Sequence, residues 1–165
     1  MTISSAQPSR LRPLALVLGA SPSPLARDGA LVVARAVVAW IFVYYGAGKL
    51  FGAFGGPGLH RTALYFSQTA HLRPGGLFAV VGGVIEFGGA LAIALGLVSR
   101  VAALALLGDQ VMAIITVTWH NGINSLSATP GYEFNLTLCA LAVVVIVFGA
   151  GRLSLDAVLA RRLRA

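Results

Sequence analysis

The sequence contains few charged residues and few of the residues that carry redox or metal chemistry. Only 10% of its 165 residues are Asp, Glu, Lys or Arg, less than half of the roughly 25% found in soluble domains. The single cysteine, Cys139, excludes a disulfide within the chain and a Cys-x-x-Cys thiol relay. The three histidines provide neither a stacked pair for haem nor a common metal-ligand spacing. We therefore expect no haem, no bound metal and no self-contained thiol oxidase.

What the sequence does contain is apolar residues and a positive net charge. Hydrophobic residues make up 58% of the chain, and its net charge is +7. A soluble fold of this composition could not cover its apolar surface, so the composition indicates a membrane protein. The basic residues are scattered between apolar blocks, an arrangement that marks membrane topology and gives no reason to expect nucleic-acid binding.

Four apolar blocks predict four membrane-spanning helices. The blocks cover residues 31–50, 77–97, 101–119 and 132–148, and each is long enough to cross a ~30 Å hydrocarbon layer. Backbone groups inside lipid must be hydrogen-bonded within the element, so each block should be helical. The short gap at 98–100 forces the second and third helices into an antiparallel hairpin. The predicted fold is an all-α integral membrane four-helix bundle, up-down-up-down, with 59–72 forming either a short interfacial helix or a packed loop.

The distribution of Lys and Arg predicts which side of the membrane each end occupies. Three basic residues fall on one side, Lys49, Arg61 and Arg73, and eight on the other: Arg10, Arg12, Arg27, Arg100, Arg152, Arg161, Arg162 and Arg164. The positive-inside rule then places the N- and C-termini in the cytoplasm. Residues 1–28 are predicted to be a flexible cytoplasmic arm, 29–151 the four-helix domain, and 152–165 a basic cytoplasmic tail in which Ser154 caps a short helix.

Ionisable residues inside the blocks are the candidates for function, because each costs at least ~2.5–3.5 kcal/mol at mid-membrane. Side chains lean toward the N-terminus of their own helix. This direction predicts an outer cluster of Glu86 with Lys49 and His120, and an inner ion pair between Arg35 and Asp109. Three interpretations stay open: structural contacts that set helix register, a redox or proton-linked site, and a substrate pathway.

Polar and aromatic neighbours extend this candidate site. Asp109, Thr116 and His120 lie within about 20° of one another on an ideal helix, which adds Thr116 to the intramembrane polar cluster. Tyr44, Tyr45 and Trp119 offer an aromatic surface that suits a quinone headgroup beside a protonatable acid. Aromatic residues at this depth also serve as packing or interface anchors.

Several short motifs follow one another in a distinctive order. They are Arg35 followed by Gly46-Ala47-Gly48-Lys49; Glu86-Phe87-Gly88-Gly89 leading to Leu95-Gly96-Leu97-Val98-Ser99-Arg100; and Gly149-Ala150-Gly151-Arg152-Leu153-Ser154-Leu155-Asp156. Over residues 34–156 this order resembles the DoxX family of four-helix bacterial membrane proteins. The resemblance implies a multi-pass protein of the bacterial cytoplasmic membrane. It also implies that Gly46, Arg100, Ser154 and Asp156 are structural positions.

The family resemblance implies a role in membrane redox chemistry. One branch of the family is linked to thiosulfate oxidation with quinone as acceptor, and another to a membrane assembly in oxidative-stress defence. The leading hypothesis is a subunit or accessory of a quinone-linked redox system in which Glu86 handles a proton, tuned by Lys49 and His120. Whether the chain itself is part of the oxidoreductase is left open. The alternative is a non-catalytic structural subunit that docks onto a larger membrane complex. The expected partners are lipid and other redox-complex subunits, or further copies of the chain.

Overall fold

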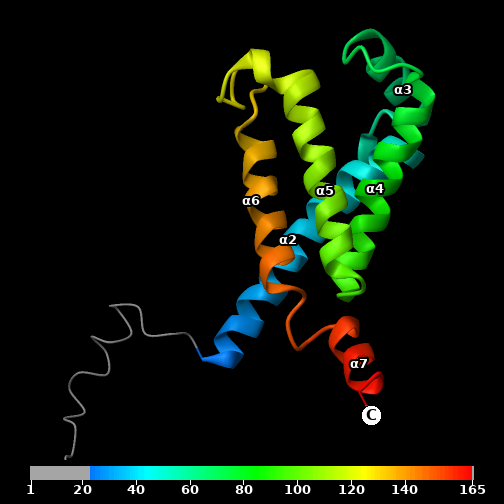
Figure 1. Cartoon of the computed structure of the whole chain (residues 1–165). Coiled ribbons are helices and arrows are strands. Elements are labelled where there is room, and N and C mark those ends of the chain that lie inside the picture. Colours follow the sequence, from blue (N-terminus) through cyan, green and yellow to red (C-terminus); the bar gives the residue numbers. More distant parts are fainter. Residues whose placement is uncertain (1–22, 165) are drawn as a thin grey trace, which may run out of the picture.

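The computed structural model describes residues 23–164, and these residues form helices and no strands (Figure 1). The α-helices are α2 (Pro24–Phe51), α3 (Gly58–Gln68), α4 (Gly75–Leu95), α5 (Ser99–Ala113), α6 (Glu133–Phe148) and α7 (Leu155–Arg162). A short 3-10 turn, η2 (Ala53–Gly55), links α2 to α3. Helix α5 continues through a π turn, η3 (Ile114–Thr118), and a 3-10 turn, η4 (Trp119–Asn121).

The first long helix begins earlier than the apolar block predicted. Ser23 accepts a hydrogen bond from the Ala26 amide, and Pro24 occupies the first turn, where its missing N–H costs nothing. Residues 24–28 of the predicted arm therefore belong to α2, and the rest of the arm, 1–22, lies outside the described residues. The helix ends at Gly52, whose φ of 69° is left-handed and suits glycine.

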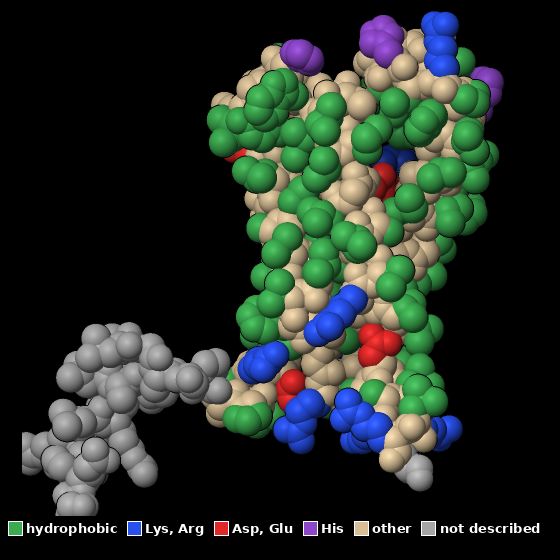
Figure 2. Space-filling model, in the orientation of Figure 1, with side chains coloured by type: hydrophobic (Ala, Val, Ile, Leu, Met, Phe, Trp, Pro, Cys, Tyr) green, Lys and Arg blue, Asp and Glu red, His purple; other side chains and the backbone are tan. Residues whose placement is uncertain are grey.

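Three of the helical stretches are long and apolar enough to cross a membrane: Pro24–Phe51, Gly75–Leu95 and Ser99–Asn121. Helix α6 is apolar but has 16 residues, a rise of about 24 Å against a ~30 Å hydrocarbon layer. Large apolar side chains such as Trp40, Val101 and Leu104 are exposed on the outside of the molecule. An exterior of this kind, with hydrophobic side chains over the middle of the face in Figure 2, belongs in lipid.

The two ends of the molecule differ in chemistry. Helices α4 and α5 meet in a tight hairpin at the lower end of Figure 1, where α7 also lies, while α3 caps the upper end. Lys and Arg side chains gather at the lower end and His side chains at the upper end (Figure 2). Of the two alternatives for 59–72, the structure forms a helix, α3, which ends at Gln68, and the predicted hairpin at 98–100 is confirmed.

The core lies where α2, α4, α5 and α6 meet. Its centre includes Phe42, Ile93, Leu106 and Leu138, all buried. Helices α2 and α4 approach closely at Gly46, where an added Cβ would lie 2.5 Å from the Phe87 backbone nitrogen. Small residues permit such close crossings of membrane helices.

Candidate functional site

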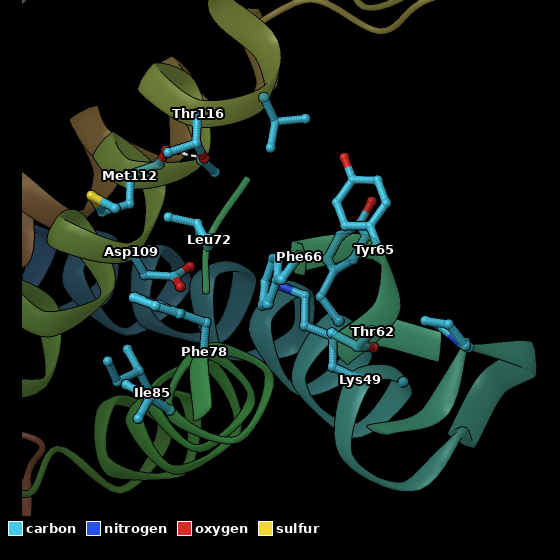
Figure 3. Close-up of a pocket in the computed structure, with 18 of the residues that line it drawn as sticks. Lys49, Thr62, Tyr65, Phe66, Leu72, Phe78, Ile85, Asp109, Met112 and Thr116 are labelled. Carbon is cyan, nitrogen blue, oxygen red and sulfur yellow. Dashed lines mark hydrogen bonds between the residues drawn. The ribbon is translucent and has the colours of Figure 1, made fainter. Parts of the chain in front are cut away.

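A cavity of about 920 Å³ opens between α3, α4 and α5 in the upper half of the molecule (Figures 2 and 3). Helices α4 and α5 diverge upward from their hairpin, and Gly82, Ala105 and Gly108 keep the facing walls thin. The volume falls in the range of sites that hold a small organic ligand, roughly 300–1,000 Å³.

The cavity walls are mainly apolar and aromatic, with polar groups at a few points. Phe66, Phe78, Ile85 and Met112 supply apolar surface, and Tyr65 adds an aromatic ring (Figure 3). Further aromatic and polar lining comes from Tyr44, Tyr45, Phe54, Arg61, Thr62, Thr116 and Thr118. A largely apolar pocket with a small number of placed polar groups is typical of a binding site for a small molecule.

An ion pair borders this cavity. Lys49 Nζ, from the last turn of α2, donates to Glu86 Oε1 of α4 at 2.6 Å. The Lys49 side chain is 25% exposed and that of Glu86 only 4%, so the ammonium reaches the cavity and the carboxyl lies behind it. The ammonium also lies 6.0 Å from the centre of the Phe66 ring, a cation–π arrangement.

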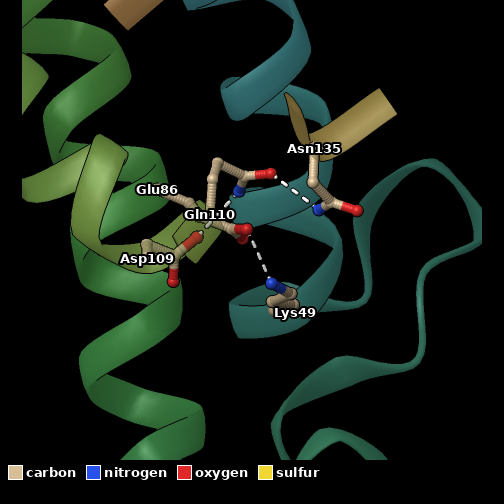
Figure 4. A network of polar contacts seen from close by, with 5 residues as sticks. All are labelled: Lys49, Glu86, Asp109, Gln110 and Asn135. Carbon is tan, nitrogen blue, oxygen red and sulfur yellow. Dashed lines mark hydrogen bonds and ion pairs between the residues drawn. The ribbon is translucent and has the colours of Figure 1, made fainter. Parts of the chain in front are cut away.

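A chain of amide side chains connects this pair to α6 (Figure 4). Asp109, which lines the cavity from α5, lies beside Glu86 (Figure 4). Gln110 Nε2 donates to Asp109 Oδ2 at 3.0 Å, and Asn135 Nδ2 of α6 donates to Gln110 Oε1 at 2.8 Å. Lys49, Glu86, Asp109, Gln110 and Asn135 together are called the carboxyl cluster below.

The predicted ion pair between Arg35 and Asp109 is wrong. Arg35 is buried at the other end, where it donates to the carbonyl oxygens of Ile93, Ala94 and Ala150 at 2.8 Å and of Leu153 at 2.9 Å. Asp109 stands ten residues into α5, about 15 Å from the hairpin. This axial separation is far more than the lean of a side chain can bridge.

His120 and Trp119 also lie apart from the predicted site. Both are exposed in η4, and neither lines the cavity. The π turn η3 advances the helix by less than the usual angle per residue, so positions beyond Thr118 rotate away from the face of Asp109. Trp119 instead stacks on Tyr132, with ring centres 5.4 Å apart. Thr116, within the π turn, lines the cavity and donates to the Met112 carbonyl at 2.7 Å.

The remaining sequence-selected residues hold the lower end together. Ser154 caps α7 by accepting from the Ala157 amide, as the sequence predicts. Asp156 accepts from the Val98 amide at 2.7 Å and from the Ser99 amide and hydroxyl at 3.0 and 2.9 Å. Burial raises the pKa of Asp156, but the hydrogen bonds from Ser99 and Val98 outweigh this and leave its pKa below the ordinary value. Arg100 is exposed, and its guanidinium lies 3.4 Å from the Val147 carbonyl.

Comparison with known protein families assigns the chain to one of them. The DoxX family model matches residues 30–119. The chain belongs to the DoxX family. No curated protein and no solved structure matches it. The matched DoxX region runs from α2 to η4 and contains Lys49, Glu86 and Asp109, whereas α6 and the 149–156 motif follow it.

Two members of the carboxyl cluster, Gln110 and Asn135, were not selected from the sequence of this DoxX protein. Both are polar residues within apolar blocks, which is a usable signal, but an uncharged amide costs less in lipid than a charge and so points less strongly to function. The cavity-lining residues of α3 were also missed, because nothing in the local pattern indicates how α3 folds against α2 and α4.

Proposed function

We propose that this DoxX protein spans the bacterial cytoplasmic membrane with four helices, α2, α4, α5 and α6, and has both termini in the cytoplasm. The gathering of Arg side chains at the end that carries α7 supports this orientation. Helix α6 would cross by including flanking residues and by local thinning of the bilayer. The cavity then opens in the outer half of the membrane.

We further propose that the protein is a subunit or accessory of a quinone-linked redox system and that its cavity binds the quinone. The observation that carries this proposal is the 920 Å³ cavity, with its apolar and aromatic walls and its edge formed by Lys49 and Asp109. A quinone offers two matching parts, a flat headgroup with carbonyl acceptors and an apolar tail. Tyr44, Tyr45 and Phe66 would contact the headgroup, and Lys49 would donate to a carbonyl.

A bound quinone would supply electron-accepting chemistry that takes up protons together with electrons. The chain's own contribution is to hold a proton at Glu86, beside the Lys49 ammonium. The apolar cavity wall keeps bulk water away from this carboxyl. Electrons would have to come from another subunit, because the sequence contains one cysteine and no haem-ligand pair.

Filling the cavity tests quinone binding. Ala113 lines the cavity from α5, so Ala113→Phe should lower the quinone that co-purifies in mild detergent by at least about tenfold, equivalent to about 1.4 kcal/mol. Solvent extraction and mass spectrometry measure the retained quinone per protein. Ala140→Phe makes the same change at an exposed site on α6 outside the cavity and should retain the wild-type amount. Equal retention by both variants, or no quinone in the wild type, would contradict the proposal.

The alternative function, a structural subunit, makes different predictions. Helix α7 and its C-terminal cap offer exposed Leu155, Leu159 and Leu163 for docking onto a partner. A structural subunit would lose its partners when residues 157–165, which follow the structural contacts of Asp156, are removed, yet tolerate Glu86→Gln without loss of activity in the assembled complex. A proton role for Glu86 requires Glu86→Gln to retain the quinone and lower quinone reduction by the purified complex.

A further inference from the structure

The carboxyl cluster contains more acidic groups than basic groups. The cluster contains two carboxyl groups and one ammonium, and among residues 23–164 the only ion pair that its acids form is that between Lys49 and Glu86. Arg61 of α3 also faces the cavity, but its side chain is exposed. The cluster residue that α6 contributes, Asn135, is uncharged. Two ionised carboxylates would therefore leave one negative charge without compensation in a largely apolar setting, which is strongly unfavourable.

The hydrogen bonds restrict where a compensating proton can lie. Glu86 Oε1 accepts from Lys49, so it does not need a proton. Asp109 Oδ2 accepts from Gln110, whose amide is oriented by Asn135: because Asn135 donates to Gln110 Oε1, the NH₂ group of Gln110 must face Asp109. The two remaining oxygens are Glu86 Oε2 and Asp109 Oδ1.

Glu86 Oε2 lacks any partner. It is the buried side-chain oxygen without a hydrogen bond in the described part of the chain, and Glu86 as a whole is 3% exposed. Such an orphaned oxygen is rare in folded proteins. Asp109 Oδ1 faces α4 at Gly82, where an added Cβ would lie 3.6 Å away, one helical turn from Glu86. Because the two side chains are neighbours, a proton on either oxygen would let the carboxyl groups hydrogen-bond to each other and would satisfy both.

We propose that Glu86 and Asp109 form an acid pair that binds one shared proton at neutral pH, with Lys49 balancing the remaining negative charge. Gln110 and Asn135 hold the Asp109 carboxylate in the orientation that accepts this proton. The inference deepens the proposed function, because it makes a pair of residues, rather than Glu86 alone, the proton store at the cavity. It does not require that the cavity bind quinone.

Infrared spectroscopy of the full chain in quinone-free detergent tests the acid pair directly. At pH 7 the wild type should show the carbonyl stretch of a protonated carboxylic acid, shifted in D₂O. Glu86→Gln and Asp109→Asn should each abolish this band, because either carboxylate alone is balanced by Lys49. Lys49→Met should raise the band up to about twofold, because neither carboxyl then has a cation beside it. The exposed Glu133 supplies the matched control, and Glu133→Gln should leave the band unchanged.

Three results would overturn the shared proton. One is the absence of a protonated-acid band from the wild type at pH 7. Another is loss of the band in only one of the two single variants, which would assign the proton to one residue. The third is a band seen only in sodium-free buffer, which would place a metal cation between the carboxyls. Helical circular dichroism and gel filtration establish that each variant is folded. Because no quinone is present, a failed quinone-retention assay leaves this result unaffected, and the reverse also holds.

Discussion

Replacing Arg35 should destabilise the lower end of the molecule more than any surface charge change. The Arg35 guanidinium is 4% exposed and donates to four backbone carbonyls, two at the end of α4 and two in the segment between α6 and α7. At about 1.5 kcal/mol for each hydrogen bond to a charged group, the four contribute about 6 kcal/mol. The variant also escapes the desolvation cost of a buried cation, so the net loss for Arg35→Met should be about 3–5 kcal/mol. Arg35→Lys keeps the charge but not the planar fork of donors, and should lose about half as much.

Thermal melting in detergent, followed by helical circular dichroism, measures this loss. For a chain of this size about 4 kcal/mol corresponds to a drop in melting temperature of about 8–16 °C. Arg162→Met removes the same charge from an exposed side chain on α7 and should change stability by less than about 0.5 kcal/mol. Limited proteolysis should cut Arg35→Met within 149–156 well before the wild type. If Arg35→Met has the same melting temperature as Arg162→Met and resists protease like the wild type, the four hydrogen bonds do not stabilise the fold.

Two more predictions concern helix contacts. Because the folded-state pKa of Asp156 is lowered, its contact with the hairpin stabilises the protein above the unfolded value of about 3.9 and is lost as pH falls through the folded value. Asp156→Asn should therefore lower the free energy of unfolding by about 1–2 kcal/mol at pH 7 and should have no effect once the wild-type carboxyl is protonated. A variant that lowers the melting temperature equally at both pH values would contradict this. Gly46→Ala should cost about 1–3 kcal/mol, because its Cβ would meet the Phe87 backbone. Gly88→Ala, where the added Cβ has no neighbour within 4 Å, should leave the free energy of unfolding unchanged or raise it by up to about 1 kcal/mol. Chemical unfolding measures both variants, and equal stabilities would rule out a close crossing at Gly46.

The local features of this fold could be predicted from the sequence because they depend on chain neighbours. Apolar blocks must be helical in lipid, so the helices appear near their predicted ranges. A gap as short as 98–100 permits only an antiparallel hairpin. Ser154 caps α7 because its hydroxyl reaches an amide three residues away. Lys49 and Glu86 could also be selected as candidates, because each is a charged residue within an apolar block.

Which polar groups meet across the bundle was decided by the tertiary structure. Asp109 lies beside Glu86, whereas Arg35 binds backbone carbonyls at the other end. The relative depth and rotation of the packed helices set these contacts, and the sequence of a single block encodes neither depth nor rotation. The π turn removed His120 from the face that an ideal helix predicts, since it changes the angle per residue. The cavity exists because α4 and α5 diverge and α3 folds back over them, so its lining joins residues from distant parts of the chain. The sequence by itself determined the apolar helices and their candidate charges. Only tertiary packing brought Lys49, Glu86 and Asp109 together beside one cavity and placed Arg35 at the other end.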